Sequence, residues 1–453
     1  MTRTVEPIST KPHIRPLLAV AIIAACLVSS LVWIKEPLLQ RAIILAGIYL
    51  TLSLTEVVPP YVPTLVLWAL TPLLLLGFGD QFRLTSVLGW SANPVLALFL
   101  GGFALSVAAS RYGIDRLIAR LAVRLSKGSK LLLLVLTMAA TAALSMWMSN
   151  IAAAAMMIAA LSPLFAEVSQ RNRFRRALLM GIAIGANLGG MATPIGTGPN
   201  AIAIAAISST RIITFTGWMI FALPLTLGLL LVGLLLLMWR FGVRGPISDL
   251  QEIRVRAPNF RARLVMLVFF LTVAAWLTEP FHRVPSATVA LITTAVLFGS
   301  GLLQSKDLSC IDWSTLLLIA GGIGLGNLLE QSGVVRAAAA SMPWQDVPHV
   351  ARLFTLCLAS ALFSALMSNT ASVTMLIPLA AGIDPAPSTA ILIAMAASLG
   401  IPFSISTPPN AMVYGEGGVT FSDLATPGIV LMILGCILVS LTGPFVLRLV
   451  GIP

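Results

Sequence analysis

The sequence predicts an all-α polytopic membrane protein, with about 11 transmembrane helices and two re-entrant helical hairpins in an inverted repeat. Three observations carry this prediction. The 453-residue chain is 58% hydrophobic and only 10% charged, a composition that excludes an ordinary soluble domain. Many apolar stretches reach about 18 residues or more, as a bilayer-spanning helix requires. A short polar motif also occurs twice, about 219 residues apart, inside apolar surroundings.

The crossings follow from the apolar stretches taken in order. After the fourth stretch, residues 114–126 carry apolar side chains at helical spacing with Arg between them, which predicts a helix lying on the membrane surface. Two longer stretches, 130–167 and 350–383, are apolar except for polar residues near their centres. The predicted crossings are 17–34, 38–58, 61–79, 93–110, 174–207, 214–240, 262–279, 285–303, 313–331, 387–415 and 424–450.

The charges beside the two interrupted stretches predict that both are hairpins of opposite orientation. Residues 111–130 and 171–176 together carry ten Lys or Arg, so the positive-inside rule places both flanks of 130–167 in the cytoplasm. Around 350–383 we find only Arg336 and Arg352 before the stretch and no Lys or Arg in 381–390. The second hairpin is therefore expected to enter from outside.

With neither hairpin crossing, the chain has its N-terminus in the cytoplasm and its C-terminus outside, in the inner (plasma) membrane of the cell. We expect a tail and first helix in 1–37, a first inverted repeat in 38–245, a cytoplasmic linker in 246–260 and a second inverted repeat in 261–453. This topology also places six arginines in and beside the linker in one cytoplasmic loop: Arg240, Arg244, Arg254, Arg256, Arg261 and Arg263.

Smaller matches support the repeat. The triplet Leu54-Thr55-Glu56 matches Leu277-Thr278-Glu279, and Gly101-Gly102 matches Gly321-Gly322. Each match is weak alone, but all of them follow the same order in both halves. The order favours duplication over chance.

The polar motifs lie at corresponding points of the two halves. Ser149-Asn150 and Ser368-Asn369 occupy the centres of the hairpins. Downstream of them come Gly196-Thr197-Gly198-Pro199-Asn200 and Ser406-Thr407-Pro408-Pro409-Asn410. Polar residues and helix breakers at membrane depth are tolerated where they line an enclosed cavity. Such breaks in both halves are typical of a carrier with one central binding site.

The hairpin tips suit a hard cation. Ser145 precedes Ser149 by four residues and Ser364 precedes Ser368 by four, so each hydroxyl pair shares a helix face. With carbonyls from the breaks at Gly196 and Ser406, each half can form an all-oxygen cage that favours Na⁺ over a transition metal. The alternative is that Ser and Asn only join neighbouring helices by hydrogen bonds.

The other ends of the broken helices suit an anion. Two helix N-termini supply about +1 charge, too little to balance a dianion. No Lys or Arg lies at a proposed tip. Bound Na⁺ could supply the remaining positive charge, which would couple the two solutes electrostatically.

Composition and spacing weigh against other classes of protein. The net charge of +12 lies in a few short loops, so it indicates membrane topology and no nucleic-acid partner. Four scattered cysteines show no metal or disulfide spacing. The predicted spans contain no His, which disfavours an intramembrane hydrolase, and we expect no enzyme activity and no organic cofactor. A passive channel is disfavoured because the site looks closed.

From about residue 38 to 450, these motifs resemble the divalent anion/sodium symporter family, whose members carry dicarboxylates, citrate or sulfate. Thr55-Glu56-Val57-Val58-Pro59 and Thr407-Pro408-Pro409-Asn410-Ala411 match that family in addition to both Ser-Asn motifs and Gly196 to Asn200. The resemblance implies an elevator-type homodimer in the lipid bilayer. It implies Na⁺ near Ser145, Ser149, Asn150 and Gly196, and near Ser364, Ser368, Asn369 and Ser406. Substrate would meet Asn150, Ile151, Thr197, Pro199, Asn369, Thr370, Thr407 and Pro408.

Two positions depart from the family pattern. Ile151 stands where the family usually has Thr, and Gly198 stands where it usually has Pro. The lost hydroxyl favours an anion with one charged end and one apolar face, or a compact oxyanion, over a standard C4-dicarboxylate.

The sequence therefore predicts a secondary active transporter, with Na⁺-coupled symport of a small anion such as a di- or tricarboxylate or sulfate. Two alternatives remain open. The first is Na⁺-independent anion exchange. The second is a Na⁺/H⁺ antiporter or an arsenite/oxyanion permease of the same superfamily, which a buried carboxylate or Lys at the tips would have favoured.

Overall fold

A computed structural model describes residues 14–55, 57–167, 169–208, 210–247, 258–340 and 347–452. Glu56 and the linker residues 248–257, on which two predictions fall, lie outside these ranges. The described secondary structure is helical apart from one isolated bridge between Ser129 and Pro246. The all-α prediction is confirmed.

The helices of the first half begin and end close to the predicted limits. Asn93 caps α5 by accepting a 3.0 Å hydrogen bond from the Val95 amide, and Gly113, with φ +68°, separates α5 from α6. The unbroken helices here are α1 (Ile14–Trp33), α2 (Pro37–Thr55), α3 (Val62–Leu75), α4 (Leu84–Gly89), α5 (Pro94–Arg111), α6 (Ile114–Leu125) and α11 (Phe215–Phe241).

The second half follows the same plan. One predicted crossing, 262–279, ends at Leu277, because Glu279 and Pro280 start a separate short turn. The unbroken helices here are α12 (Phe260–Leu277), α13 (Glu279–His282), α14 (Ser286–Gly299), α15 (Trp313–Gln331), α16 (Val334–Ala340) and α21 (Phe421–Leu449).

Four apolar stretches are interrupted where the motifs predict. Both interrupted stretches that we expect to be hairpins form helix pairs joined at their Ser-Asn motifs, and crossings 174–207 and 387–415 are each broken in two. The pairs are α7 (Lys130–Ser145) with α8 (Asn150–Glu167), α9 (Arg173–Gly189) with α10 (Gly198–Ile207), α17 (His349–Leu366) with α18 (Asn369–Ile383), and α19 (Pro387–Ala397) with α20 (Pro408–Gly415).

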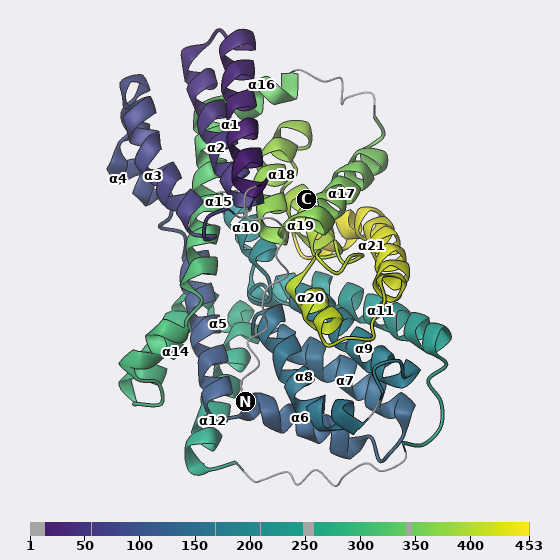
Figure 1. Ribbon diagram of the computed structural model, residues 1–453. Helices are drawn as coiled ribbons and strands as arrows, with labels where there is room; N and C mark the ends of the chain where they lie inside the picture. The colour runs from purple at the N-terminus through teal and green to yellow at the C-terminus, as the bar shows by residue number, and fades with distance from the viewer. Residues whose placement is uncertain are drawn as a thin grey trace.

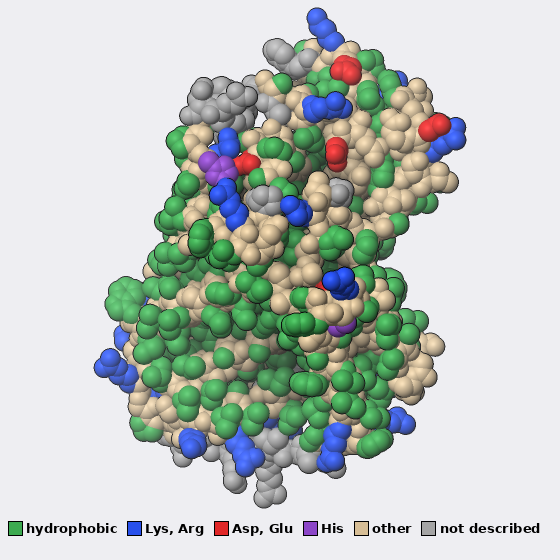
Figure 2. Space-filling view, turned by 180° about the vertical axis from the view of Figure 1, so that it is seen from behind, with side chains coloured by type: hydrophobic (Ala, Val, Ile, Leu, Met, Phe, Trp, Pro, Cys, Tyr) green, Lys and Arg blue, Asp and Glu red, His purple; other side chains and the backbone are tan. Residues whose placement is uncertain are grey.

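The surface is that of a membrane protein. Within the described residues, seven helices are long and apolar enough to cross a bilayer, by length and composition: α2, α5, α11, α12, α15, α17 and α21. Figure 2 shows apolar side chains over the middle of one face, with Lys and Arg mostly toward its ends. The total of 11 crossings, the re-entrant path of the hairpins and the homodimer stay predictions.

Helix packing repeats between the halves. Helix α7 packs on α9 as α17 packs on α19, and α10 packs on α19 as α20 packs on α9. The unbroken helices also exchange partners, since α5 of the first half packs on α14 and α15 of the second half packs on α3. In Figure 1, α1–α4, α15 and α16 lie above α5, α12 and α14, with most of the broken helices toward the right. The helices of each half are therefore packed against helices of the other half.

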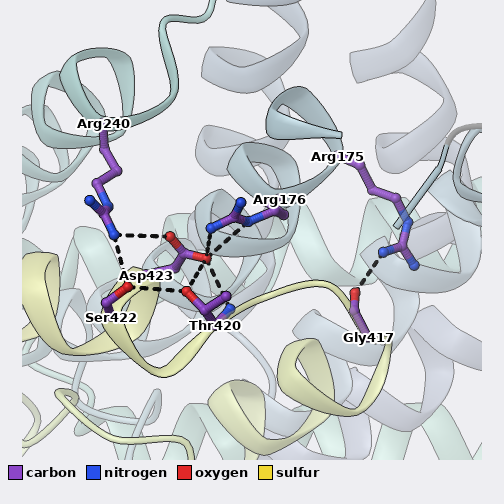
Figure 3. A network of polar contacts seen from close by, with 7 residues as sticks. All are labelled: Arg175, Arg176, Arg240, Gly417, Thr420, Ser422 and Asp423. Carbon is purple, nitrogen blue, oxygen red and sulfur yellow. Dashed lines mark hydrogen bonds and ion pairs between the residues drawn. The ribbon is translucent and has the colours of Figure 1, made fainter. Parts of the chain in front are cut away.

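A buried carboxylate joins three helices (Figure 3). Asp423, fully buried in the first turn of α21, accepts hydrogen bonds from Arg176 Nε at 2.9 Å and from the Thr420 amide at 2.9 Å. The Arg240 guanidinium lies 3.4 Å from its second oxygen. Arg175 of α9 donates to the carbonyl of Gly417, which lies on the loop before α21, at 2.7 Å. These contacts connect α9 and α11 to the start of α21.

We expect Asp423→Asn to lower the free energy of unfolding by about 3 kcal/mol, because it leaves two Arg side chains without their buried countercharge. Thermal unfolding in detergent would measure the change. Asp80→Asn is the matched control, since the Asp80–Arg83 ion pair is largely exposed and should contribute less than about 1 kcal/mol. Equal loss in both variants would contradict a specific role for Asp423.

Candidate functional site

The first hairpin tip forms a compact group of oxygens. The Ser145 hydroxyl lies 2.7 Å from Asn150 Oδ1 and 2.6 Å from the carbonyl oxygen of Ala186. Ser145 is fully buried. A hydroxyl carries one proton, so these three oxygens share a single hydrogen. Such an arrangement is electron-rich and suits a cation better than a further hydrogen-bond acceptor.

The second hairpin tip repeats this group. The Ser364 hydroxyl lies 2.6 Å from Asn369 Oδ1 and 2.6 Å from the carbonyl oxygen of Ala397, and Ser364 is fully buried. The structure therefore brings together the first Ser and the Asn of each predicted sodium set. It also adds a carbonyl from α9 or α19 that sequence reasoning did not identify.

The second Ser of each tip serves as a helix cap. Ser149 accepts a 3.3 Å hydrogen bond from the Ala152 amide, and Ser368 accepts one of 3.2 Å from Ala371. Each starts the helix that follows it, and each keeps a free lone pair for a ligand.

A hydroxyl in each downstream break holds the break against the neighbouring hairpin. Ser406 donates to the carbonyl of Ala365 at 2.8 Å, and Thr193 donates to the corresponding carbonyl of Met146. Gly196 and Ser406 are expected counterparts in the two sodium sets, but the hydroxyl whose contact matches that of Ser406 belongs to Thr193. Gly196 is needed for another reason, because a Cβ there would lie 2.3 Å from the carbonyl oxygen of Gly190.

The asparagines of the downstream motifs hold the breaks in shape. Asn200 Nδ2 donates to the carbonyls of Gly190 at 3.1 Å and Thr193 at 2.8 Å. Asn410 Nδ2 donates to the carbonyls of Ile401 and Phe403 at 2.8 and 2.9 Å. Both asparagines were outside the predicted site, although their recurrence in both motifs was a visible signal. They satisfy the carbonyls that a broken helix leaves unpaired at membrane depth.

Four helix N-termini, not two, belong to these motifs. Helices α8, α10, α18 and α20 begin at Asn150, Gly198, Asn369 and Pro408. The starts of α10 and α18 are in contact, because a Cβ on Gly198 would lie 2.6 Å from Thr370 Oγ1. Gly198, a departure from the family pattern, thus gives Thr370 its space.

The predicted substrate residues differ in exposure. Thr197 and Thr407 are buried, at 7% and 3% exposed, whereas Ile151 is 49% exposed. Thr407 accepts a hydrogen bond from the Asn410 amide at 3.4 Å. Thr197 Oγ1 has no hydrogen-bond partner in the described part of the chain, so a ligand would satisfy it. Pro199 is buried and Pro408 exposed.

The donor set fits Na⁺. The Ser, Asn and Thr groups named above and the carbonyls beside them are neutral oxygens. Within the described residues, no three His, Cys, Asp or Glu side chains gather as a metal site. Hard neutral oxygens are the ligands of an alkali cation and not of a transition metal.

A family model described as citrate transporter (CitMHS) matches residues 8–400. A Haemophilus influenzae protein described only as a transporter is 29% identical over 434 residues, covering 90% of this chain and 92% of its own length. The Saccharomyces cerevisiae inorganic phosphate transporter PHO87 is 27% identical over 83% of this chain, which spans 43% of that protein.

Two further relatives bear on coupling and fold. The sodium-dependent dicarboxylate transporter SdcS of Staphylococcus saprophyticus is 25% identical over 86% of this chain and 82% of its own. The crystal structure of the Alcanivorax borkumensis YdaH transporter superposes with a TM-score of 0.59 at 17% identity, covering 89% of this chain and 98% of that one. This last likeness concerns the fold alone.

We expect Gly198→Ala to lower the free energy of unfolding by about 1–3 kcal/mol, because its methyl group would press on the Thr370 hydroxyl. The double variant Gly198→Ala/Thr370→Ala should recover most of that loss, a coupling that thermal unfolding of the double-mutant cycle would measure. Gly77→Ala is the control, since a Cβ there meets nothing within 4 Å. Strictly additive losses would show that Gly198 and Thr370 do not touch.

Proposed function

The chain belongs to the citrate transporter family and is a transporter of the divalent anion/sodium symporter type; from this we propose that it couples Na⁺ to the uptake of a small anion. The observation that carries the coupling is the duplicated group of a Ser hydroxyl, an Asn oxygen and a carbonyl, one in each half. We assign one Na⁺ to each group. Ser145, Asn150 and the Ala186 carbonyl, with Gly196 beside them, would hold the first ion; Ser364, Asn369 and the Ala397 carbonyl, with Ser406, would hold the second.

Helix ends give the electrostatic argument. Four helix N-termini supply about +2 charge, but α7, α9, α17 and α19 bring four C-termini to the same breaks and about −2. The helix ends therefore separate positive from negative regions without adding net charge. The charge of a bound anion must then be balanced by bound cations. This is why uptake of the anion should require Na⁺.

The residues at the two hairpin tips limit which kinds of anion would fit the site. Thr370 offers its hydroxyl beside the start of α10, while the corresponding residue at the first tip is the half-exposed Ile151. We propose a substrate whose charged group lies near Asn369 and Thr370 and whose apolar face lies near Ile151, or a compact oxyanion. The names of the relatives, which include a phosphate and a dicarboxylate transporter, agree with this range.

Contacts between loops support the proposed topology. Loops and helix ends that should share the cytoplasmic side touch one another, and so do those that should share the outside. The first group comprises Lys130 with Gly245, Tyr112 with Leu302, Arg111 with Asp307 and Arg176 with Asp423. The second group comprises Arg41 with Leu74, Asn93 with Ser208, Phe215 with Glu279 and His349 with Asp384.

The two halves differ in exposure at matched positions, which supports alternating access of the elevator type. Ile195 is 5% exposed and packs beneath α5, where a Cβ on Gly102 would lie 3.0 Å from it. Its counterpart Ile405 is 80% exposed. Phe403, two residues before it, stacks on Phe421 near the Asp423 network. We propose that this conformation opens to that side, the cytoplasm, and that the opposite state exposes Ile195.

Purified protein in proteoliposomes should take up radiolabelled succinate, phosphate or a monocarboxylate faster, by tenfold or more, with an inward Na⁺ gradient than with choline. Uptake should depend on two bound cations, so Asn150→Ala and Asn369→Ala should each abolish it. Competition among these anions, sulfate and citrate would identify the substrate class. Uptake that ignores Na⁺ but needs internal anion would replace symport by exchange. Unchanged uptake in both Asn variants would refute the site.

Cysteine accessibility tests alternating access with a matched pair, Ile195→Cys and Ile405→Cys, in a background without native cysteines. A membrane-impermeant maleimide should label Ile405→Cys from the cytoplasmic side because that loop faces an aqueous opening. Ile195→Cys should be protected from that side and labelled slowly from the other. A lipid-facing Ile405 would resist the reagent from either side, and that result would contradict the proposed opening.

A further inference from the structure

The two broken crossings can be aligned residue by residue through their hydrogen bonds. Ser145 contacts the carbonyl of Ala186, and Ser364 contacts that of Ala397. The next residues along the chain, Asn187 and Ser398, are therefore counterparts. Asn200 and Asn410 are counterparts as well, since both donate their side-chain amide to the two carbonyls of their own break.

The broken helices of the two halves meet in two places, α9 with α20 and α10 with α19. The first contact includes a direct hydrogen bond between side chains. Asn187 of α9 donates from Nδ2 to Asn410 Oδ1 of α20 at 2.9 Å. The repeat places Ser398, the residue directly after α19, opposite Asn200 of α10, and these two helices pack together as α9 and α20 do. A serine hydroxyl stands one bond closer to its backbone than an asparagine amide, so the corresponding direct bond is not made.

The unmatched pair leaves polar atoms without partners. Asn200 Oδ1 and Ser398 Oγ lack a hydrogen-bond partner within the described residues, and the two residues are 0% and 1% exposed. Asn187 Oδ1, on a residue 2% exposed, also lacks a partner within the described residues, although its Nδ2 is bonded to Asn410. Buried polar atoms in native proteins are satisfied by protein or by ordered water.

We infer that a single buried water molecule bridges Asn200 and Ser398 in the crossing of the two broken helices. One water donates to Asn200 Oδ1 and accepts from the Ser398 hydroxyl. Buried waters make between about two and four hydrogen bonds. A cation fits less well, because two neutral side-chain oxygens form a small set and Ser398 can also act as a donor.

This water contacts Asn200, the residue that holds the first break of the candidate site in shape. Asn200 holds the segment from Gly190 to Thr193, and Gly196 and Thr197 follow directly. The first break is thus anchored to the opposite half through water. The second break is anchored directly, through Asn187 and Asn410.

The test is Ser398→Asn, which supplies the longer side chain found at position 187 and displaces the water. We expect the Tm to stay the same or rise by about 1–3 °C. Ser360→Asn is the matched control: Ser360 is also fully buried, but its hydroxyl already donates to the carbonyl of Ile393 at 2.9 Å. That variant should lower the Tm. Equal destabilisation by both would overturn the water site.

A second variant keeps the inference falsifiable if Asn does not fit. Ser398→Ala removes a partner of the water and should lower the Tm. If the two atoms were instead unpaired and dry, removing one would leave the Tm unchanged or raise it, and that result would overturn the inference. Melts in NaCl and in choline chloride complete the design. A Na⁺-dependent gain in Tm that disappears in Ser398→Asn would identify a cation and overturn the water.

Discussion

The architecture depends on how backbone groups are satisfied where helices break inside an apolar protein. A break leaves up to four carbonyls and four amides without helical partners, and lipid offers them none. Here each break is closed by side chains from its own half: Asn200 and Asn410 pair the carbonyls of the downstream breaks, and Ser149 and Ser368 cap the helices after the tips. The groups that remain, notably the oxygens around Ser145 and Ser364, are those that can bind solute.

Internal duplication gives the two halves similar chemistry. The differences between them bear on which conformation the molecule is in and on which anion it prefers. Ile195 and Ile405 lie at matched positions, each five residues before the asparagine of its motif, but have opposite exposure. The proposed alternating access would account for this difference. In this conformation Ile195 of the first break packs against α5, and in the opposite state the two environments would be exchanged.

Much of the fold could be predicted from the sequence, because apolar runs, Pro, Gly and basic flanks determine helix limits directly. The breaks at Ser149-Asn150 and Thr407-Pro408 were predicted for the same reason. The site was predicted less fully. Thr193 was missed because the 210-residue offset between Asn200 and Asn410 aligns it with Phe403, whereas its hydrogen bond matches that of Ser406, 213 residues further along. The carbonyls of Ala186 and Ala397 carry no sequence signal, since any residue supplies one.

The two departures from the family pattern have a common consequence. Gly198 lacks the side chain that would crowd Thr370, and Ile151 lacks the hydroxyl that Thr370 supplies in the other half. Both changes lie in the first half, and both make the hydroxyl of the second half the available polar group. The first half would then contribute an ion, helix amides and an apolar wall, while the second contributes an ion and the hydrogen bond that orients the anion. Selectivity among anions should accordingly depend on how much apolar surface a substrate presents to Ile151. The proposed coupling, which would rest on the duplicated oxygens, should be shared equally between the halves.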